Sequence, residues 1–382
     1  MDMREKVLKM HEEWQGKIEI KSKTTVNSKE DLSIAYTPGV AEPCREIEKD
    51  KSNAYKYTMK GNTVAIISDG TAVLGLGDIG PEAAMPVMEG KALLFKEFSG
   101  VNAIPLCIDT KDTKEIIKFA KQIAPSFGGI NLEDISAPRC FEIEEALKNE
   151  LDIPVFHDDQ HGTAIVVLAA LINALKVVGK TKEEVKVVVN GAGAAGLAIT
   201  KLLINYGFKN IVVVDKSGIL SKDETWMNWA QKAICEETNK ENLRGSLKDA
   251  LCGADIFIGV SAPNIVSEEM VASMNKDAIV FAMANPLPEI NPQLAKKAGA
   301  KVVGTGRSDY PNQINNVLVF PGIFKGALLA RASKITEEMK IAAAVAIAGM
   351  INDEELNAEN IVPAPFTKGV ADKVAKAILE LS

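Results

Sequence analysis

The sequence predicts an α/β fold in two parts, each built around a sheet of mainly parallel strands. Three observations lead to that class. Strand-like and helix-like segments alternate along the chain. The later strands are nearly continuous apolar runs, which are typical of buried parallel strands. The 382 residues also exceed the size of one ordinary core. A doubly wound arrangement is expected from such a pattern.

The first part is expected to span residues 1–160 and to alternate strands with amphipathic helices. Asp69-Gly70 is a hairpin signal, so residues 72–76 are predicted to return as a partner strand. Polar residues that follow strands here should gather at the carboxyl edge of the sheet, where open α/β folds place their sites. The predicted strands are 64–68, 101–108, 129–132 and 153–156, and the predicted helices are 82–98, 112–123 and 137–147.

The second part is expected to span residues 161–382 and to begin with a buried helix near Gly162. The most apolar segment, residues 163–175, is too short to cross a bilayer. Two amphipathic C-terminal helices, residues 337–351 and 369–381, are predicted to pack back onto the first part. The predicted parallel strands are 187–189, 211–214, 256–260, 278–283 and 301–303.

Composition and charge narrow the function classes. A net charge of -7 argues against nucleic acid or an anionic membrane as the main partner. The five cysteines are widely spaced and form no C-x-x-C pair, which is typical of reduced thiols in a cytoplasmic protein. We expect neither an export signal nor a membrane-spanning segment.

A glycine fingerprint follows the first strand of the second part. Gly191, Gly193 and Gly196 stand in G-x-G-x-x-G order between that strand and an apolar helix, which predicts a dinucleotide site. The alternative is a glycine-rich turn without a ligand. Asp215 ends the next strand, where it would bind a ribose 2′-hydroxyl and favour NAD, whereas Lys216 and Ser217 could receive the 2′-phosphate of NADP. The full predicted loop comprises Gly191, Ala192, Gly193, Ala194, Ala195 and Gly196.

Two acidic clusters precede the fingerprint. Glu133, Asp134 and Asp159 follow predicted strands and offer the oxygen ligands that Mg²⁺ or Mn²⁺ prefers. The alternative for Asp159 and its neighbour Asp158 is capping of the long helix that follows. His157 and His161 have the i, i+4 spacing of a zinc helix. However, Asp158 replaces the usual Glu, and Gly162 is expected to spoil that helix, so a zinc hydrolase is not favoured.

Two further residues are ambiguous from their local sequence. Lys91 lies among small and apolar residues, where burial near a metal could lower its pKa and make it a general base. Composition alone favours a surface lysine. Tyr36 precedes a Pro-Gly turn, and a buried tyrosine in such a place is usually structural.

Motifs spread over most of the chain resemble those of a known family, and this resemblance resolves the ambiguities at Lys91 and Tyr36. In their order and residues they closely resemble the small bacterial and archaeal type of malic enzyme. The matching segments are residues 36–41, 68–78, 90–91, 131–134, 157–163, the glycine fingerprint, 284–286 and 315–322.

The resemblance implies a malic-type α/β domain followed by a Rossmann-like NAD(P)-binding domain. The implied reaction converts (S)-malate and NAD(P)⁺ to pyruvate, CO₂ and NAD(P)H with Mg²⁺ or Mn²⁺. Lys91 would be the general base that also contacts malate, and Tyr36 the general acid. Asn285 and Asn316 would bind the substrate carboxylate or the nicotinamide side. The implied metal ligands are Glu133, Asp134 and Asp159.

One position departs from the larger malic enzymes. They carry an arginine that binds the malate carboxylate, and Ala72 aligns with it here. The carboxylate would then be bound by backbone N–H groups near residues 73–75 or by a basic residue of a partner chain. The resemblance and the amphipathic ends, residues 3–14 and 369–381, predict a homodimer in which N-terminal segments cover the other subunit. Two rival functions remain: a malolactic or simple malate dehydrogenase, and a non-catalytic NAD-binding regulator.

Overall fold

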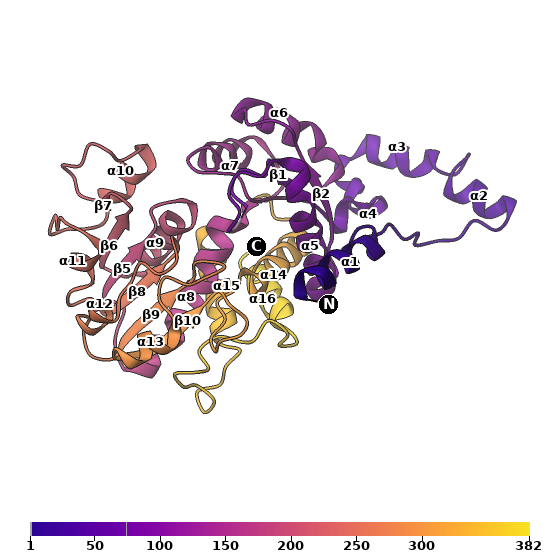
Figure 1. The fold of residues 1–382 in the computed structure, drawn as a ribbon. Coiled ribbons are helices and arrows are strands. Elements are labelled where there is room, and N and C mark those ends of the chain that lie inside the picture. Colours follow the sequence, from indigo (N-terminus) through magenta and orange to yellow (C-terminus); the bar gives the residue numbers. More distant parts are fainter. Residues whose placement is uncertain (1, 74) are drawn as a thin grey trace.

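The computed structural model describes residues 2–73 and 75–382 and confirms the α/β class (Figure 1). The first sheet has four strands in the order β2-β1-β3-β4, and every pairing is parallel. Each predicted strand is found to within two residues at either end. The strands are β1 (Thr63–Ser68), β2 (Asn102–Cys107), β3 (Gly129–Leu132) and β4 (Val155–His157).

The helices between these strands begin at clear local signals. Pro81 occupies the first turn of α5, where its missing N–H costs nothing. The Asp112 carboxylate accepts the N–H groups of Lys114 and Glu115 and so caps α6. The elements are α5 (Pro81–Ser99), α6 (Thr113–Ile123), η3 (Ala124–Ser126) and α7 (Arg139–Glu150).

The hairpin predicted at Asp69-Gly70 is wrong. Both edges of β1 are already paired, with β2 on one side and β3 on the other, so no edge is left for a returning strand. The chain instead makes a compact turn with one antiparallel bridge between Val73 and Gly77. Leu74, within the predicted partner strand, lies outside the described residues.

The second sheet has six strands in the order β10-β9-β8-β5-β6-β7. Its pairings are parallel except for the short β7, which the sequence did not predict and which runs antiparallel to β6. The sheet's strands are β5 (Lys186–Asn190), β6 (Asn210–Asp215), β7 (Gly218–Ile219), β8 (Ile256–Gly259), β9 (Ala278–Ala282) and β10 (Ala300–Thr305). Its helices are α9 (Ala194–Tyr206), α10 (Trp229–Cys235), α11 (Leu247–Leu251), α12 (Glu268–Ala272) and α13 (Pro292–Lys297).

Helix α8 (Asp158–Val178) joins the two sheets and crosses the predicted boundary between residues 160 and 161, which stays a prediction. It packs against α9, against η4 (Asn316–Leu318) and against α15 (Glu337–Ala348). By length and composition α8 could cross a membrane, but most of it is buried in the interior of the chain. It is therefore a core helix.

Of the two C-terminal helices predicted to pack back onto the first part, α16 (Val370–Leu379) does so by reaching α5, whereas α15 packs mainly against α8 and α16. Helix α14 (Phe320–Ala330) contacts both α5 and α16. The aromatic rings of Phe95 on α5 and Phe320 on α14 lie 4.7 Å apart between centroids. Phe320 at the start of α14 also lies against Lys91, with the Nζ atom 4.1 Å from the ring centroid.

Figure 1 shows helices α2 and α3 projecting away from the rest of the chain. We call the segment that contains them, residues 29–49, the arm. No residue of α1, α2 or α3 is buried. The elements before the first sheet are α1 (Met3–Trp14), α2 (Lys29–Ala35), α3 (Ala41–Lys49), η1 (Lys51–Asn53), α4 (Ala54–Tyr57) and η2 (Met59–Asn62).

Candidate active site

Three carboxylates meet at the carboxyl edge of the first sheet. Glu133 and Asp134 directly follow β3, and Asp159 lies in the first turn of α8, directly after β4. Each offers an oxygen, and these oxygens lie within 4.8 Å of one another. The backbone N–H of Asp134 donates to Asp159 Oδ2 at 2.8 Å, which joins the two segments. The sequence-predicted metal ligands are therefore brought together.

The electrostatics of this cluster favour a cation. Burial, and then the charges of Asp159 and Glu133, raise the pKa of Asp134 to about 9. Asp134 Oδ2 is buried and has no hydrogen-bond partner among the described residues. Crowded, partly unpartnered carboxylate oxygens are the donor set that a hard divalent ion requires. The residues present therefore fit Mg²⁺ or Mn²⁺.

Lys91 lies inside the same cluster. Its side chain on α5 is only 8% exposed, so the surface-lysine interpretation is wrong. Lys91 Nζ lies 2.9 Å from Glu133 Oε1 and also donates to Asp158. Burial alone would lower the pKa of Lys91, but the charges of Asp158 and Glu133 raise it above its ordinary value. These two partners outweigh desolvation in the metal-free chain, so the lowered pKa expected beside a metal stays a prediction.

Asp158 is an organising residue of the cluster. It is fully buried, and its carboxylate accepts from Lys91 and from the Asn316 amide. Helix α8 begins at Asp158, so Gly162 lies within its first turns rather than spoiling them. A Cβ on Gly162 would stand 1.9 Å from Asp158 Oδ1. Glycine is needed there because the buried carboxylate occupies the space of a side chain.

The capping alternative for the acidic pair is not what the structure shows. His157 is the N-cap of α8, and no side chain caps the helix there. Asp158 pairs with Lys91, and Asp159 accepts from the Asp134 backbone instead. The negative charges still lie at the positive end of the helix, which favours them.

The glycine fingerprint has the geometry of a dinucleotide loop. Gly191 has φ +117°, a conformation that L side chains rarely adopt. A Cβ on Gly196 would lie 1.7 Å from the Gly191 carbonyl oxygen, so α9 can pack this closely only with glycine. The loop lies at the carboxyl end of β5, where the strand order reverses between β6 and β8.

Asp215 ends β6 beside this loop, and the structure adds a residue that sequence reasoning missed. Gln231 on α10 donates to Asp215 Oδ2, and also to the Ala192 carbonyl at 3.2 Å. It thereby connects the ribose-side carboxylate to the glycine loop. Gln231 lies in a capping box with Asn228, and nothing in that local pattern distinguishes it from an ordinary helix start.

Asn285 and Asn316 lie on different elements near the cluster. Asn316 begins η4 and contacts Asp158. Asn285 follows β9 and approaches the turn after β1: a Cβ on Gly75 would meet its carbonyl oxygen at 3.3 Å. The second sheet thus touches the turn that carries Ala72.

Tyr36 is not brought to the cluster. It ends α2 on the projecting arm and is 67% exposed. The buried structural tyrosine expected from the Pro-Gly turn is therefore wrong.

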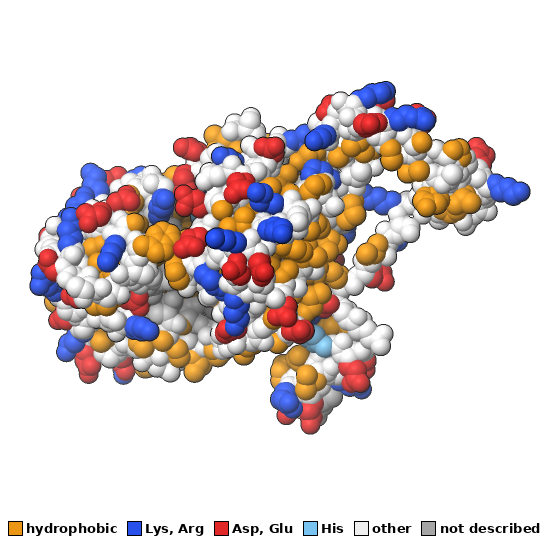
Figure 2. All heavy atoms as spheres, turned by 90° about the horizontal axis from the view of Figure 1, so that it is seen from above, with side chains coloured by type: hydrophobic (Ala, Val, Ile, Leu, Met, Phe, Trp, Pro, Cys, Tyr) orange, Lys and Arg blue, Asp and Glu red, His pale blue; other side chains and the backbone are white. Residues whose placement is uncertain are grey.

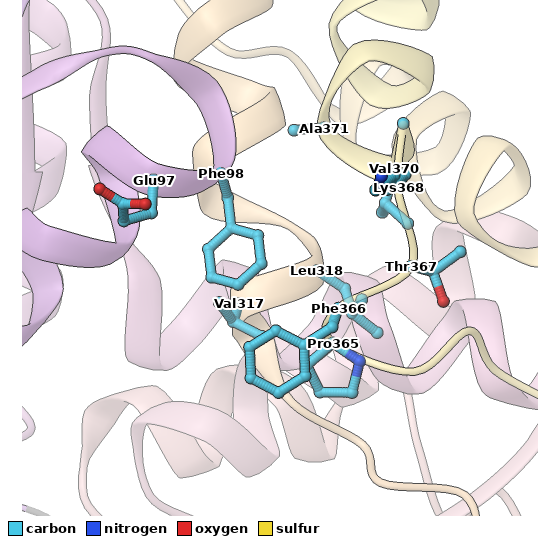
Figure 3. Close-up of a pocket in the computed structure, with 11 residues that line it drawn as sticks. Glu97, Phe98, Val317, Leu318, Pro365, Phe366, Thr367, Lys368, Val370 and Ala371 are labelled. Carbon is cyan, nitrogen blue, oxygen red and sulfur yellow. The ribbon is translucent and has the colours of Figure 1, made fainter.

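Two cavities lie outside the cluster. One, of about 290 Å³, lies beside α5, η4 and the start of α16, and Figure 3 shows Phe98 and Phe366 among the residues that line it, with ring centroids 6.0 Å apart. The other, of about 440 Å³, lies between α7, α8, α9 and α10, with Glu144 and His161 on its wall. None of the predicted metal ligands lines either cavity.

Fold and site together define a nucleotide-dependent oxidoreductase with an acidic site beside its dinucleotide domain. The family described as "Malic enzyme, N-terminal domain" matches residues 15–148, and "Malic enzyme, NAD binding domain" matches residues 160–381. The chain therefore belongs to the malic enzyme family, which confirms the resemblance seen in the sequence.

Individual relatives agree. The chain is 61% identical to an NAD-dependent malic enzyme of Geobacillus stearothermophilus, over 96% of this chain and 76% of that one. It is 58% identical to a bifunctional malic/malolactic enzyme of Bacillus subtilis, over 99% and 92%. The crystal structure of an NAD-dependent malic enzyme from Thermotoga maritima superposes with a TM-score of 0.95 at 50% identity, covering 99% of both chains.

Proposed function

We propose that the chain catalyses the oxidative decarboxylation of (S)-malate to pyruvate and CO₂, with reduction of NAD⁺ or NADP⁺. The observation that carries this proposal is the buried meeting of Glu133, Asp134 and Asp159 with Lys91. The malic enzyme relatives support the substrate and the reaction. We also propose a cytoplasmic location, which the widely spaced cysteines favour.

In this proposal Glu133, Asp134 and Asp159 hold Mg²⁺ or Mn²⁺. When bound, such an ion polarises the C2 oxygen of the substrate and stabilises charge that develops there. Asn316 and Asn285 would orient malate and the nicotinamide from the second part of the chain. Phe320 at the start of α14 lies with its ring centroid 4.1 Å from Lys91 Nζ, and so helps to exclude water from this lysine.

Lys91 is the proposed base. Its Nζ takes the proton of the C2 hydroxyl while hydride passes from C2 to the nicotinamide. To do so Lys91 must first be neutral, and its carboxylate partners oppose that in the free protein. Glu133 is both a partner of Lys91 and a proposed metal ligand. Occupation of the site would therefore weaken one of the two charges that raise the pKa of Lys91.

The malate carboxylate needs a partner other than the arginine that Ala72 replaces. The Ala72 N–H donates to the Asp134 carbonyl and the Val73 N–H to the Gly77 carbonyl, so neither is free. Leu74 lies outside the described residues. The carboxylate would then be bound by the Gly75 N–H or by a basic group from a partner chain, which are the alternatives that the sequence left open.

We further propose a homodimer in which Tyr36 acts in the partner's site. The arm presents Leu32, Ile34 and Tyr36 to solvent, each at least half exposed. Figure 2 shows hydrophobic side chains gathered both on the arm and on the neighbouring face of the body. Apolar surfaces of this kind mark contacts between proteins. A second copy would cover them and bring a tyrosine hydroxyl to a cluster whose own Tyr36 lies elsewhere.

Mixed dimers test this arrangement. A Tyr36→Phe chain paired with a Lys91→Ala chain contains one doubly altered site and one intact site if Tyr36 acts in the partner. Co-purified heterodimers, selected with two different tags, should then regain about half of the wild-type activity, although each parent homodimer is inactive. If Tyr36 acts within its own chain, every site carries one defect and no activity returns. That result would refute the exchange.

The reaction itself is tested by absorbance at 340 nm with malate, Mn²⁺ and either NAD⁺ or NADP⁺, with pyruvate measured separately. We expect NAD(P)H and pyruvate in equal amounts. Reduced cofactor without pyruvate would indicate a simple malate dehydrogenase. Absence of turnover, with cofactor still bound, would indicate a regulator.

Malolactic activity is a second candidate, because a relative that covers 99% of this chain is a bifunctional malic/malolactic enzyme. Lactate formation keeps the cofactor bound and yields no net NADH. Lactate produced from malate without a change in absorbance at 340 nm would therefore show this activity.

A further inference from the structure

Beneath the carboxylate cluster, Glu144 contacts both sides of the turn that carries Asp158 and Asp159. Glu144 lies on α7 and is 5% exposed. One of its oxygens accepts the backbone N–H of His157 at 3.1 Å, immediately before Asp158. Both oxygens lie within 2.9 Å of the His161 ring nitrogen Nε2, immediately after Gln160. The acidic turn is thus held at its start and at its end by one carboxylate.

The His161 ring has a second partner that determines its tautomer. Lys340 Nζ, on α15, lies 3.0 Å from His161 Nδ1. An ammonium group can only donate, so Nδ1 accepts from Lys340. Lys148 Nζ lies 3.3 Å from Nε2, but both Glu144 oxygens are closer, at 2.8 and 2.9 Å, and can only accept. Nε2 therefore carries the proton and donates to Glu144. Lys340 in this way orients the ring, and through the ring the carboxylate of Glu144.

The charges of this network balance. Glu144 pairs with Lys148 at 2.6 Å, and Lys340 pairs with Glu337 at 2.6 Å. Glu337 also accepts from Asn205 on α9 at 3.1 Å. Two carboxylates and two ammonium groups surround a neutral imidazole, so each buried charge has a partner. The network extends from the first sheet to the dinucleotide part of the chain.

We propose that Glu144 is a positioning residue for the divalent-ion site, acting through His157 and His161 on the turn that carries Asp159. This inference rests on the proposed role of Glu133, Asp134 and Asp159 as metal ligands. Outer partners of metal ligands commonly affect metal affinity ~10- to 100-fold, because they fix the ligand geometry. Glu144 contacts none of the three ligands directly, so its effect must pass through the backbone and first turn of α8.

The test is a Mn²⁺ titration of the metal-free dimer, followed by the electron paramagnetic resonance signal of free Mn²⁺. Glu144→Gln keeps the shape but turns an acceptor into an N–H group that opposes His161 Nε2–H. It should bind Mn²⁺ ~10- to 100-fold more weakly than wild type. Glu145→Gln removes the same charge from an exposed neighbour on α7 and should leave Mn²⁺ affinity unchanged.

A pair of His161 variants tests the network independently of Glu144. The amide of His161→Gln can still donate to Glu144 and accept from Lys340, whereas His161→Leu can do neither. Mn²⁺ affinity should be largely restored in His161→Gln and lost in His161→Leu. If Glu144→Gln fails to fold, this pair still decides the question.

Two further measurements separate positioning from general damage. NADH affinity, read from its fluorescence, should stay within about twofold of wild type in Glu144→Gln, since the glycine loop is untouched. At saturating Mn²⁺ kcat should largely return, because the ligands themselves are intact. Unchanged Mn²⁺ affinity in both Glu144→Gln and His161→Leu would overturn the inference while leaving the proposed function standing. Failure of the wild type to bind Mn²⁺ would overturn both.

Discussion

The metal-free protein should lose stability as the pH rises from about 6.5 to about 8.5, because its carboxylate cluster is then forced to ionise. The pKa of Asp134 is about 9 in the folded chain, against 3.8 in a free side chain. Between these two values the folded state holds a proton that the unfolded chain has released. The free energy of unfolding therefore falls with increasing pH.

The magnitude follows from the linkage relation. Each pH unit in this window costs about 1.4 kcal/mol for one such group, so Asp134 alone contributes about 3 kcal/mol over two units. For a chain of 382 residues, an unfolding entropy of about 2 cal/mol/K per residue converts this to a melting temperature about 4 °C lower. Asp158, whose pKa burial raises to about 7, adds to the loss at the lower end of the range.

The buried histidines set the lower limit of the window. Burial lowers the pKa of His157 and lowers that of His161 to about 4. A lowered histidine pKa destabilises the folded state only below the ordinary value, about 6.5, and has no further effect above it. Above about pH 6.5 the change of the unfolding free energy with pH therefore comes from the carboxylates and not from the histidines.

The assay is differential scanning fluorimetry of the chelated protein across this range, beside Asp134→Asn and beside wild type saturated with Mn²⁺. The Mn²⁺-saturated protein should be nearly flat, since the ion keeps the carboxylates ionised throughout. Asp134→Asn should lose most of the slope and keep only the contribution of Asp158 at the lower end of the range. A melting temperature that is constant or rises with pH in the chelated wild type would refute the reasoning. So would an Asp134→Asn slope equal to that of wild type.

Four other changes have definite outcomes. EDTA should abolish turnover and Mn²⁺ or Mg²⁺ restore it, and full activity after exhaustive chelation would contradict the metal assignment. Lys91→Ala should lower kcat for malate oxidation ~10²- to 10⁴-fold, measured at saturating malate and cofactor. Asp215→Ser should shift the ratio of kcat/KM values towards NADP⁺, and an unchanged ratio would mean that Asp215 does not contact the ribose. Gly162→Ala should destabilise the chain by ~1–3 kcal/mol in a denaturant titration because its Cβ overlaps Asp158. Gly90→Ala, in open space on α5, is the matched control and should be neutral or stabilising.

The sheets and most helices could be predicted because their signals are local. Apolar runs such as residues 187–189 and 211–214 favour buried parallel strands, and Pro81 is a favoured first-turn residue of a helix. The hairpin at Asp69-Gly70 failed because pairing is not local. The turn signal was real, but β2 and β3, which come later in the chain, occupy both edges of β1.

The site residues divide in the same way, into those that the local sequence places and those whose partners depend on packing. Glu133, Asp134 and Asp159 could be placed together because parallel strands end at one edge of a sheet. The partners of Lys91, Glu144 and Gln231 could not, since each depends on how separate helices pack. Lys91 shows the consequence: burial was foreseen correctly as a possibility, yet the direction of its pKa shift depends on Asp158, 67 residues away.

Tyr36 marks the limit of reasoning from one chain. Its motif identified the tyrosine, but its local sequence indicated a buried structural residue, and the single chain instead leaves it 67% exposed. Neither a buried structural tyrosine nor an exposed tyrosine on the arm could protonate a substrate carbon beside Lys91 of the same chain. A general acid must be within hydrogen-bond reach of the atom it protonates. The chain therefore either acts without Tyr36 or acquires that hydroxyl from a second copy, and the mixed dimer of Tyr36→Phe with Lys91→Ala decides between these two mechanisms.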